Sequence, residues 1–354
     1  MNRVGLVSTL VPPTAASASL RQTLRYHQAP DHGRSAWQVV IAFLSFIGLC
    51  ALMYALVDVS IWLTLVLAVP AGGFVVRIFI LQHDCGHGAL FRSRALNDWV
   101  GRLCSLVTFT PYDNWKRQHA LHHANWNNLD RRESGADIYS TCLTTAEYRR
   151  LPAGRRLLYR LVRHPLIALV LLPPVVFLVL YRLPFDTPAA WRRERLSVHG
   201  TNLALLALAA TLGLTLGFGT VAMVQLPIIA VAAIIGVWLF SVQHRFDGTA
   251  WFRRVAWSAQ AASLQGTSYL RLPGVLRWFT GNIGFHHVHH LNARIPNYRL
   301  ATCHDANSDL RDVPTLSLGA ALRSSTCWLW DEERRRMVSF AAATSGDESC
   351  GTKT

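Results

Sequence analysis

The sequence predicts an all-α integral membrane protein with four transmembrane helices in two hairpins beneath a cytoplasmic helical cap. Hydrophobic residues make up 51% of the 354 residues and charged residues only 16%, and the mean hydropathy is +0.23. Several apolar runs approach the ~20 residues that a helix needs to cross a bilayer. Three histidine clusters next to such runs indicate where the cap carries chemistry.

The first hairpin follows an N-terminal segment, residues 1–36, that is expected to be a cytoplasmic tail. This segment lacks the charged, apolar and small-residue regions of a signal peptide. The first two spans are expected at about residues 37–57 and 61–82, with a short turn at Asp58. The first histidine cluster comes directly at the end of the second span.

Residues 91–164 are polar and rich in arginine, which places them in the cytoplasm by the positive-inside rule. The apolar stretch 166–181 follows. It is short, it contains Pro173-Pro174, which disfavours a continuous helix, and it is followed by further arginines. We therefore expect it to be an interfacial or re-entrant segment rather than a span.

The second hairpin is expected at about residues 203–224 and 226–243, with its turn near Pro227. This assignment gives an even number of crossings between the second histidine cluster and the end of the last span. Both termini then lie in the cytoplasm, and residues 311–354 are expected to form a C-terminal cytoplasmic tail.

Eight histidines form three clusters with the patterns HxxxH, HxxHH and HxxHH. They are His83 and His87; His119, His122 and His123; and His286, His289 and His290. Residues at i, i+3 and i+4 share one face of a helix, so each cluster directs its imidazoles to a common point. One such pair is a weak signal, but three beside membrane-length segments predict a metal site.

Two metals fit these clusters better than one. His122 and His123 are adjacent, so they diverge by ~100° on a helix, and the same holds for His289 and His290. His244 ends the last span at the depth where the first cluster begins, and this symmetry makes it a ninth candidate ligand. No catalytic residue beyond the metal ligands and no cofactor-binding residue is predicted.

Other polar residues receive structural roles. Asp84 lies between the first two histidines and is expected to orient a ligand, and His287 is expected to support the metal ligands without binding metal. The remaining histidines, expected to be structural or on the surface, are His27, His32, His164, His199 and His304. The seven cysteines are odd in number and include no CxxC, so reduced thiols are expected.

The ligand type alone does not identify the metal, because imidazole suits Zn, Cu, Fe and Ni. Zinc sites usually use three or four ligands, and eight or nine histidines are too many for one zinc. A site at the membrane points to a lipid substrate. Oxygen activation by iron for attack on an unactivated C–H bond is one of the few lipid reactions that needs two redox metals.

The sequence resembles the integral-membrane fatty acid desaturases, in particular the bacterial Δ12 (omega-6) acyl-lipid branch. The resemblance covers roughly residues 37–310, and it implies that these residues form the membrane fatty acid desaturase domain. The matching motifs beside the clusters are Thr110-Pro-Tyr, Trp115, His122-His-Ala, Asn128-Leu-Asp-Arg-Arg132, Val242-Gln-His244, Trp278-Phe-Thr-Gly-Asn-Ile-Gly-Phe285 and His289-His-Leu-Asn-Ala-Arg-Ile-Pro-Asn-Tyr298.

The resemblance implies two iron ions held by the nine histidines, a fatty acyl substrate carried by a lipid, CoA or a carrier protein, and O2 as the oxidant. It also implies residence in the bacterial inner membrane with the active site facing the cytoplasm. The sequence has no HPGG motif of a fused cytochrome b5 domain. Electrons are therefore expected from an external donor such as ferredoxin, for which the arginine-rich face is a docking surface.

Two positions depart from the pattern. Phe240 stands where animal acyl-CoA desaturases carry asparagine, and Trp126 is bulkier than the residues typical of the Δ12 branch, which raises the possibility of altered regiochemistry. A hydroxylase or acetylenase of the same fold remains the alternative. A histidine-rich metal transporter is disfavoured because it would need ionisable residues along its spanning helices. Segments 37–57, 203–224 and 226–242 contain no charged residue and no histidine. The arginines lie beside apolar segments, so nucleic-acid binding is not expected.

Overall fold

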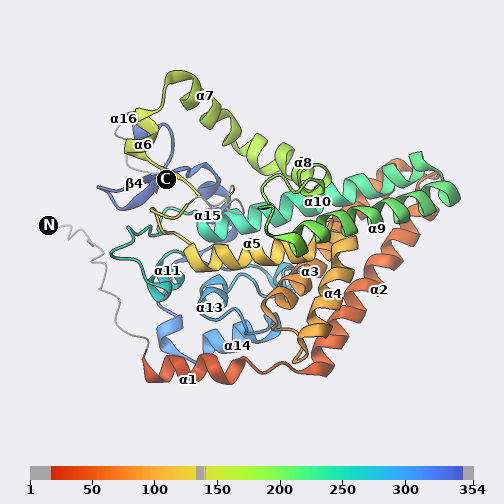
Figure 1. The fold of residues 1–354 in the computed structure, drawn as a ribbon, viewed down its shortest axis with the longest axis horizontal. Coiled ribbons are helices and arrows are strands. Elements are labelled where there is room, and N and C mark those ends of the chain that lie inside the picture. Colours follow the sequence, from red (N-terminus) through yellow and green to blue (C-terminus); the bar gives the residue numbers. More distant parts are fainter. Residues whose placement is uncertain (1–16, 133–138, 140, 346–354) are drawn as a thin grey trace.

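The computed structural model describes residues 17–132, 139 and 141–345, and four long helices dominate it (Figure 1). They extend together toward one end of the molecule, while the shorter elements gather at the other. The four are α2 (His32–Leu56), α3 (Ile61–His87), α9 (Arg192–Leu216) and α10 (Phe218–His244). Each is long and apolar enough to cross a membrane. The prediction of an all-α membrane fold with two helical hairpins is confirmed.

Helices α3 and α10 form the centre of the bundle, and small residues let them approach closely. A Cβ atom added at Gly72 would lie 2.7 Å from Val231 Cγ1. Ala68 and Ala71 of α3 pack with Ile228 of α10 in the same buried cluster. Close approach of small residues is the usual way in which helices associate in lipid, where burial from water adds no driving force between them.

The turn of the second hairpin lies earlier than predicted. The chain turns at Gly217, whose φ of +90° is in a region that side chains rarely adopt. Helix α10 then continues through Pro227. The prediction of a turn near Pro227 is wrong because a proline inside an apolar helix is tolerated when neighbouring helices cover the freed backbone group.

The segment that contains Pro173-Pro174 is helical as well. It comprises a π-helix (Ile167–Leu171), α8 (Leu172–Leu178) and a 3₁₀ turn (Leu180–Arg182). The two prolines occupy the first turn of α8, where an amide hydrogen has no helical partner to lose. Together with α7 (Ala153–Val162) this segment could form a fifth, bent span with a 52° angle, so its interfacial placement stays a prediction.

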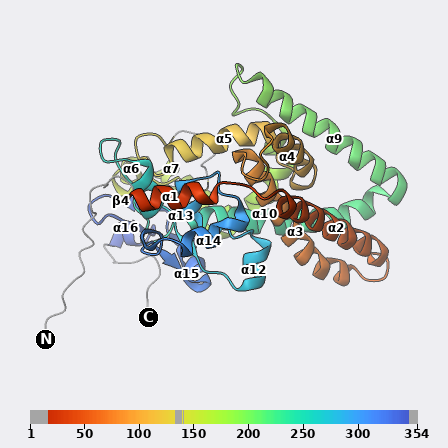
Figure 2. The ribbon, with the colours of Figure 1, turned by 90° about the horizontal axis from the view of Figure 1, so that it is seen from below.

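The cap is built from short elements around the ends of α3 and α10, and Figure 2 shows α1, α13 and α14 close together on one side. Its helices are α1 (Ala18–His27), α4 (Arg94–Thr108), α5 (Tyr112–Asn125), α6 (Thr145–Arg150), α11 (Ala259–Gln265), α12 (Gly274–Phe279), α13 (His286–Leu291), α14 (Leu300–Asp305), α15 (Leu318–Arg323) and α16 (Ala342–Ser345). Helix α5 packs against both α3 and α9.

The chain after residue 310 is packed against the cap as far as Ala343, rather than being a free tail. The strands are β1 (Leu143–Thr144), β2 (Tyr269–Leu270), β3 (Thr315–Leu316), β4 (Leu329–Asp331) and β5 (Arg336–Val338). Strand β4 pairs parallel with β1 and antiparallel with β5, and β3 pairs parallel with β2. Trp328 is buried beneath the Arg245 guanidinium, whose carbon lies 3.1 Å from the ring centroid.

The N-terminal segment also contributes to the packed structure. Helix α1 packs on α14 and buries Leu20 and Leu24. The outermost parts of both predicted tails, residues 1–16 and 346–354, lie outside the described residues. Cys327 is disulfide-bonded, so the expectation of reduced thiols is wrong at that position.

Candidate metal centre

The first histidine cluster occupies the last turn of α3. His83 and His87 share the face that is directed into the cap, and their ring centroids lie 4.8 Å apart. The helix ends at Gly88, which adopts a left-handed φ of +66° and returns its N–H to the carbonyls of Asp84 and Cys85. This left-handed cap ends the helix immediately after the second ligand and turns the chain away.

The second and third clusters lie on α5 and α13, which approach the end of α3 from different sides. Trp115 stacks on His119, with centroids 4.6 Å apart and ring planes 16° apart, and so fixes the orientation of that imidazole. Helix α13 places His286 and His289 in the buried interior. The three clusters, far apart in the sequence, therefore meet at one place.

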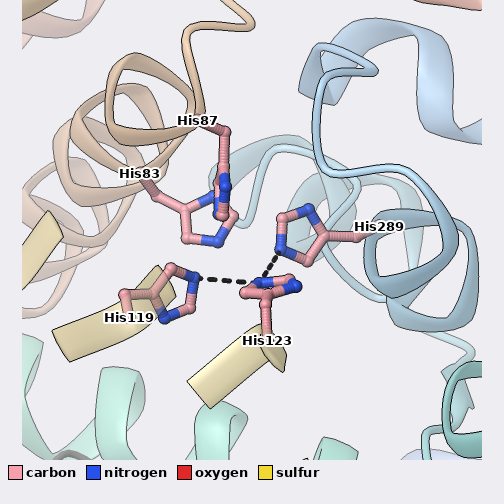
Figure 3. A group of neighbouring side chains, drawn as sticks. All are labelled: His83, His87, His119, His123 and His289. Carbon is pink, nitrogen blue, oxygen red and sulfur yellow. Dashed lines mark hydrogen bonds between the residues drawn. The ribbon is translucent and has the colours of Figure 1, made fainter. Parts of the chain in front are cut away.

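The histidines divide into two groups. The first comprises His83, His87, His119, His123 and His289, whose candidate ligand atoms all lie within 4.8 Å of one another (Figure 3). The Nε2 atom of His123 lies 3.2 Å from His119 Nε2 and 3.0 Å from His289 Nε2. These five rings come from three helices and surround a common point.

The second group comprises His122, His244 and His290, within the same 4.8 Å limit. His244 Nε2 lies 3.1 Å from His122 Nε2 and 2.9 Å from His286 Nε2. His286 therefore joins this group through its contact with His244. All nine predicted ligands are thus close to one of two points.

The adjacent histidines separate as the ~100° rotation per residue predicts. His123 belongs to the first group and His122 to the second; His289 belongs to the first and His290 to the second. This division is the geometry that two neighbouring metal ions need. The role of the nine residues as ligands stays a prediction.

The chemistry of the two groups fits metal ions. The Nε2 atoms of His87 and His290 are buried and have no hydrogen-bond partner among the described residues, a costly arrangement unless another group satisfies them. Burial, reinforced by neighbouring imidazoles, holds the pKa of His119, His123 and His289 well below the ordinary 6.5. Neutral imidazoles are the form that binds metal.

Asp84 lies beside the first group, and its role in orienting a ligand stays a prediction. Its Oδ1 atom lies 3.6 Å from His83 Nδ1. Its Oδ2 atom accepts hydrogen bonds from the backbone N and the side-chain Nδ2 of Asn297, at 2.7 and 2.8 Å. Sequence reasoning did not single out Asn297 as a site residue, although it lies in a family motif. The signal that could have identified Asn297 is its short polar side chain close to the third cluster in the sequence.

His287 does not contact the metal ligands through its ring nitrogens. Its Nε2 atom lies 3.0 Å from His304 Nδ1, and burial lowers the pKa of His287 to about 3. The two rings pack beside Tyr269. The interpretation of His287 as a support for the ligands is therefore wrong; it pairs with His304, a residue correctly expected to be structural.

Phe240 and Trp126 both pack on the second group. Phe240 lies 5.2 Å, centroid to centroid, from His122 and from His244, so an apolar ring covers these imidazoles. Trp126 lies 4.0 Å from His244, is buried, and donates its Nε1 hydrogen to the carbonyl of Gly266 at 2.9 Å. Trp126 does not line the cavity described next.

An apolar cavity ends at the histidines. It runs between α3, α8 and α10 and reaches imidazoles of both groups. Its lining includes Val75, Val76, Phe79, Val176, Phe177, Ile229, Ala232, Ala233, Gly236 and Val237, and at the metal end His83, His119, His122 and His286. Ile229 lies about four helical turns from the last residue of α10. The cavity is thus long, apolar and closed by candidate metal ligands.

Comparison with known proteins places these features in a family. The fatty acid desaturase family matches residues 60–315. A fatty acid desaturase of Bacillus subtilis (strain 168) is 42% identical over 313 residues, 88% of each chain. An sn-1 acyl-lipid omega-3 desaturase (ferredoxin) of Synechocystis sp. is 29% identical over 65% of this chain and 63% of its own.

An sn-1 oleoyl-lipid 12-desaturase of Picosynechococcus sp. is 27% identical over 75% of this chain and 74% of its own. The family match covers more than half of the chain and includes all three histidine clusters, and the match to the Bacillus relative covers 88% of the chain. The chain therefore belongs to the fatty acid desaturase family.

Proposed function

We propose that this enzyme is an O2-dependent di-iron desaturase that introduces a cis double bond into a fatty acyl chain. The observation that carries the proposal is the apolar cavity that ends at His83, His119, His122 and His286. A cavity of this kind accepts an alkyl chain and rejects polar substrates. It also brings unactivated methylenes next to both groups of imidazoles.

Two iron ions held by the nine histidines would supply oxygen activation strong enough to break such C–H bonds. The reaction balances when O2 receives four electrons. Two come from the two hydrogens removed from adjacent methylenes, and two come from a donor. With the protons that accompany them, they yield one double bond and two water molecules.

The chain's own residues bind the acyl chain and orient the candidate metal ligands. The walls from α3 and α10 exclude water from the reacting methylenes, and the Phe240 ring covers the imidazoles of His122 and His244. Trp115 stacks on the ring of His119, and the Asp84 carboxylate lies beside the ring of His83. Fixed ligand orientation of this kind maintains metal geometry during turnover.

The Δ12 (omega-6) position is the finer part of the proposal. The motifs around the clusters favour it. The comparisons do not separate it from an omega-3 position, because oleoyl-lipid 12-desaturases of Picosynechococcus sp. and Synechocystis sp. are 27% identical and an acyl-lipid omega-3 desaturase of Synechocystis sp. is 29% identical. A hydroxylase or acetylenase of the same fold is the second candidate, because it begins with the same hydrogen abstraction. Trp126 no longer supports altered regiochemistry, since it lies outside the cavity.

The electron donor is proposed to be an external acidic protein such as ferredoxin. One relative carries ferredoxin in its name. Helix α7 buries none of its residues and presents Arg155, Arg156 and Arg160. Exposed arginines steer an acidic partner toward the surface. We also place the protein in the bacterial inner membrane with its metal centre toward the cytoplasm, where such a donor is found.

A fatty-acid profile tests the proposal. The chain and a His122→Ala control are expressed in a bacterial host rich in monounsaturated fatty acids, and total lipids are analysed by gas chromatography and mass spectrometry. A dienoic acid made only by the wild type is the expected result, with its bond position testing the Δ12 assignment. A hydroxylated or acetylenic product would favour the second candidate, and purified protein without iron would refute the di-iron centre.

A further inference from the structure

A second cavity of about 370 Å³ lies on the other side of α3, and the desaturase chemistry does not use it. Its walls come from α2, α3, α12 and the chain around α13. Among the residues that the structure describes, none lines both this cavity and the acyl cavity. The side chains that matter for its chemistry are Gln38, Arg77, Arg277 and Trp278.

Arg77 is a buried cation without a counterion. It is 6% exposed, although it lies in a membrane-spanning helix. Its guanidinium donates to the carbonyl of Trp278 and, at a long 3.5 Å, to Gln38 Oε1. Its Nε atom is buried without a partner, and in the described part of the chain no carboxylate lies within 4 Å of it.

Burying an unpaired charge is strongly unfavourable. The Trp278 ring compensates in part, since the guanidinium carbon lies 3.9 Å from its centroid. Arg277 adds a second, exposed cation at the mouth of the same cavity. Two guanidinium groups, of which Arg77 has a buried Nε without a partner in the described chain, give this cavity the chemistry to bind an anion.

The surroundings of the cavity indicate a lipid as the source of that anion. Trp37 is 65% and Trp278 41% exposed, and tryptophans of this kind lie at the boundary between membrane and water. Next to them α2 presents the exposed apolar side chains of Val40 and Leu44. An acyl chain could lie on this face while its headgroup enters the cavity.

We propose that this cavity binds the phosphate group of an acidic phospholipid, with Arg77 as the buried cation and Arg277 as the cation at the mouth. Arginine forks match phosphate oxygens in geometry as well as charge. Basic pockets between membrane helices recognise lipid headgroups in this way. None of the nine candidate metal ligands lines this cavity, although Asn297, which contacts Asp84, does. The proposal does not depend on the proposed reaction.

The test measures lipid binding to the purified protein by native mass spectrometry. Phosphatidylglycerol and phosphatidylcholine are titrated into detergent micelles, with wild type, Arg277→Gln, Arg77→Lys and Arg77→Gln. Arg25→Gln, which removes an exposed arginine of α1, is the matched control. Since Arg77→Gln could fail to fold, Arg77→Lys and Arg277→Gln decide the result on their own.

We expect the wild type and Arg25→Gln to bind phosphatidylglycerol about tenfold more tightly than phosphatidylcholine, and Arg277→Gln and Arg77→Lys to lose most of this preference. Equal binding of the two lipids by the wild type, or an unchanged preference in both arginine variants, would overturn the proposal. Displacement by millimolar glycerol 3-phosphate would also overturn it, because the ligand would then be a soluble phosphate.

Discussion

Gly236 offers a direct test of the acyl cavity. On α10, Ile229, Ala233, Gly236 and Phe240 recur at helical spacing and line the cavity. A Cβ atom added at Gly236 would meet no heavy atom within 4 Å. Space therefore exists at this position for a side chain, about two helical turns from the end of α10.

The change Gly236→Leu fills part of this space with four carbon atoms. Folding should not suffer, because leucine is favoured over glycine in a helix by about 0.5–1 kcal/mol. A bound acyl chain must then be displaced or compressed. Overpacking costs about 1–3 kcal/mol, which corresponds to a loss of about 5- to 150-fold in turnover of long chains. Shorter chains should be affected less.

The assay is the fatty-acid profile normalised to the amount of purified protein, together with the melting temperature. Gly72→Ala is the control, because its Cβ would lie 2.7 Å from Val231 Cγ1, outside the cavity. This control should lower the melting temperature and leave the product distribution unchanged. Full activity of Gly236→Leu on long chains would refute the cavity as the substrate channel.

Four further substitutions test the cap and the surroundings of the metal centre. Asp84→Asn should weaken metal retention about 10- to 100-fold, measured by elemental analysis during chelator competition. Asn297→Ala should weaken it less. Retention equal to the wild type in both variants would contradict the supporting role of Asp84 and Asn297. Burial opposes ionisation of Glu147, but hydrogen bonds from Arg132 outweigh it and lower its pKa from 4.5 to about 2. The stabilisation by this pair is therefore complete above about pH 4.5 and disappears as the pH falls toward 2. In Glu147→Gln the melting temperature should depend less on pH in that window than in the wild type. An equal decline in both proteins would exclude a contribution of the pair to stability. Trp126→Phe should cost about 0.5–1.5 kcal/mol through its lost hydrogen bond and leave the double-bond position unchanged, and a shifted bond would show that Trp126 acts on the substrate.

Local features of the sequence were sufficient to predict the membrane spans and to identify the histidine clusters. A run of apolar residues predicts a membrane helix because the cost of transfer into hydrocarbon depends on each residue alone. The divergence of His122 from His123 follows from the rotation of a helix. The turn at Gly217 was missed because Pro227 is a strong local signal, which packing of α10 against α3 overrides.

The sequence by itself determined that the protein is a four-helix membrane protein with nine candidate histidine ligands. Only the tertiary structure decided how these nine histidines divide into two groups, with His286 beside His244 rather than in the first group. It also decided that Asn297 supports Asp84, 213 residues away. Such contacts depend on how α3, α10 and α13 pack, and packing energy is shared among many side chains, so no local pattern in the sequence encodes it.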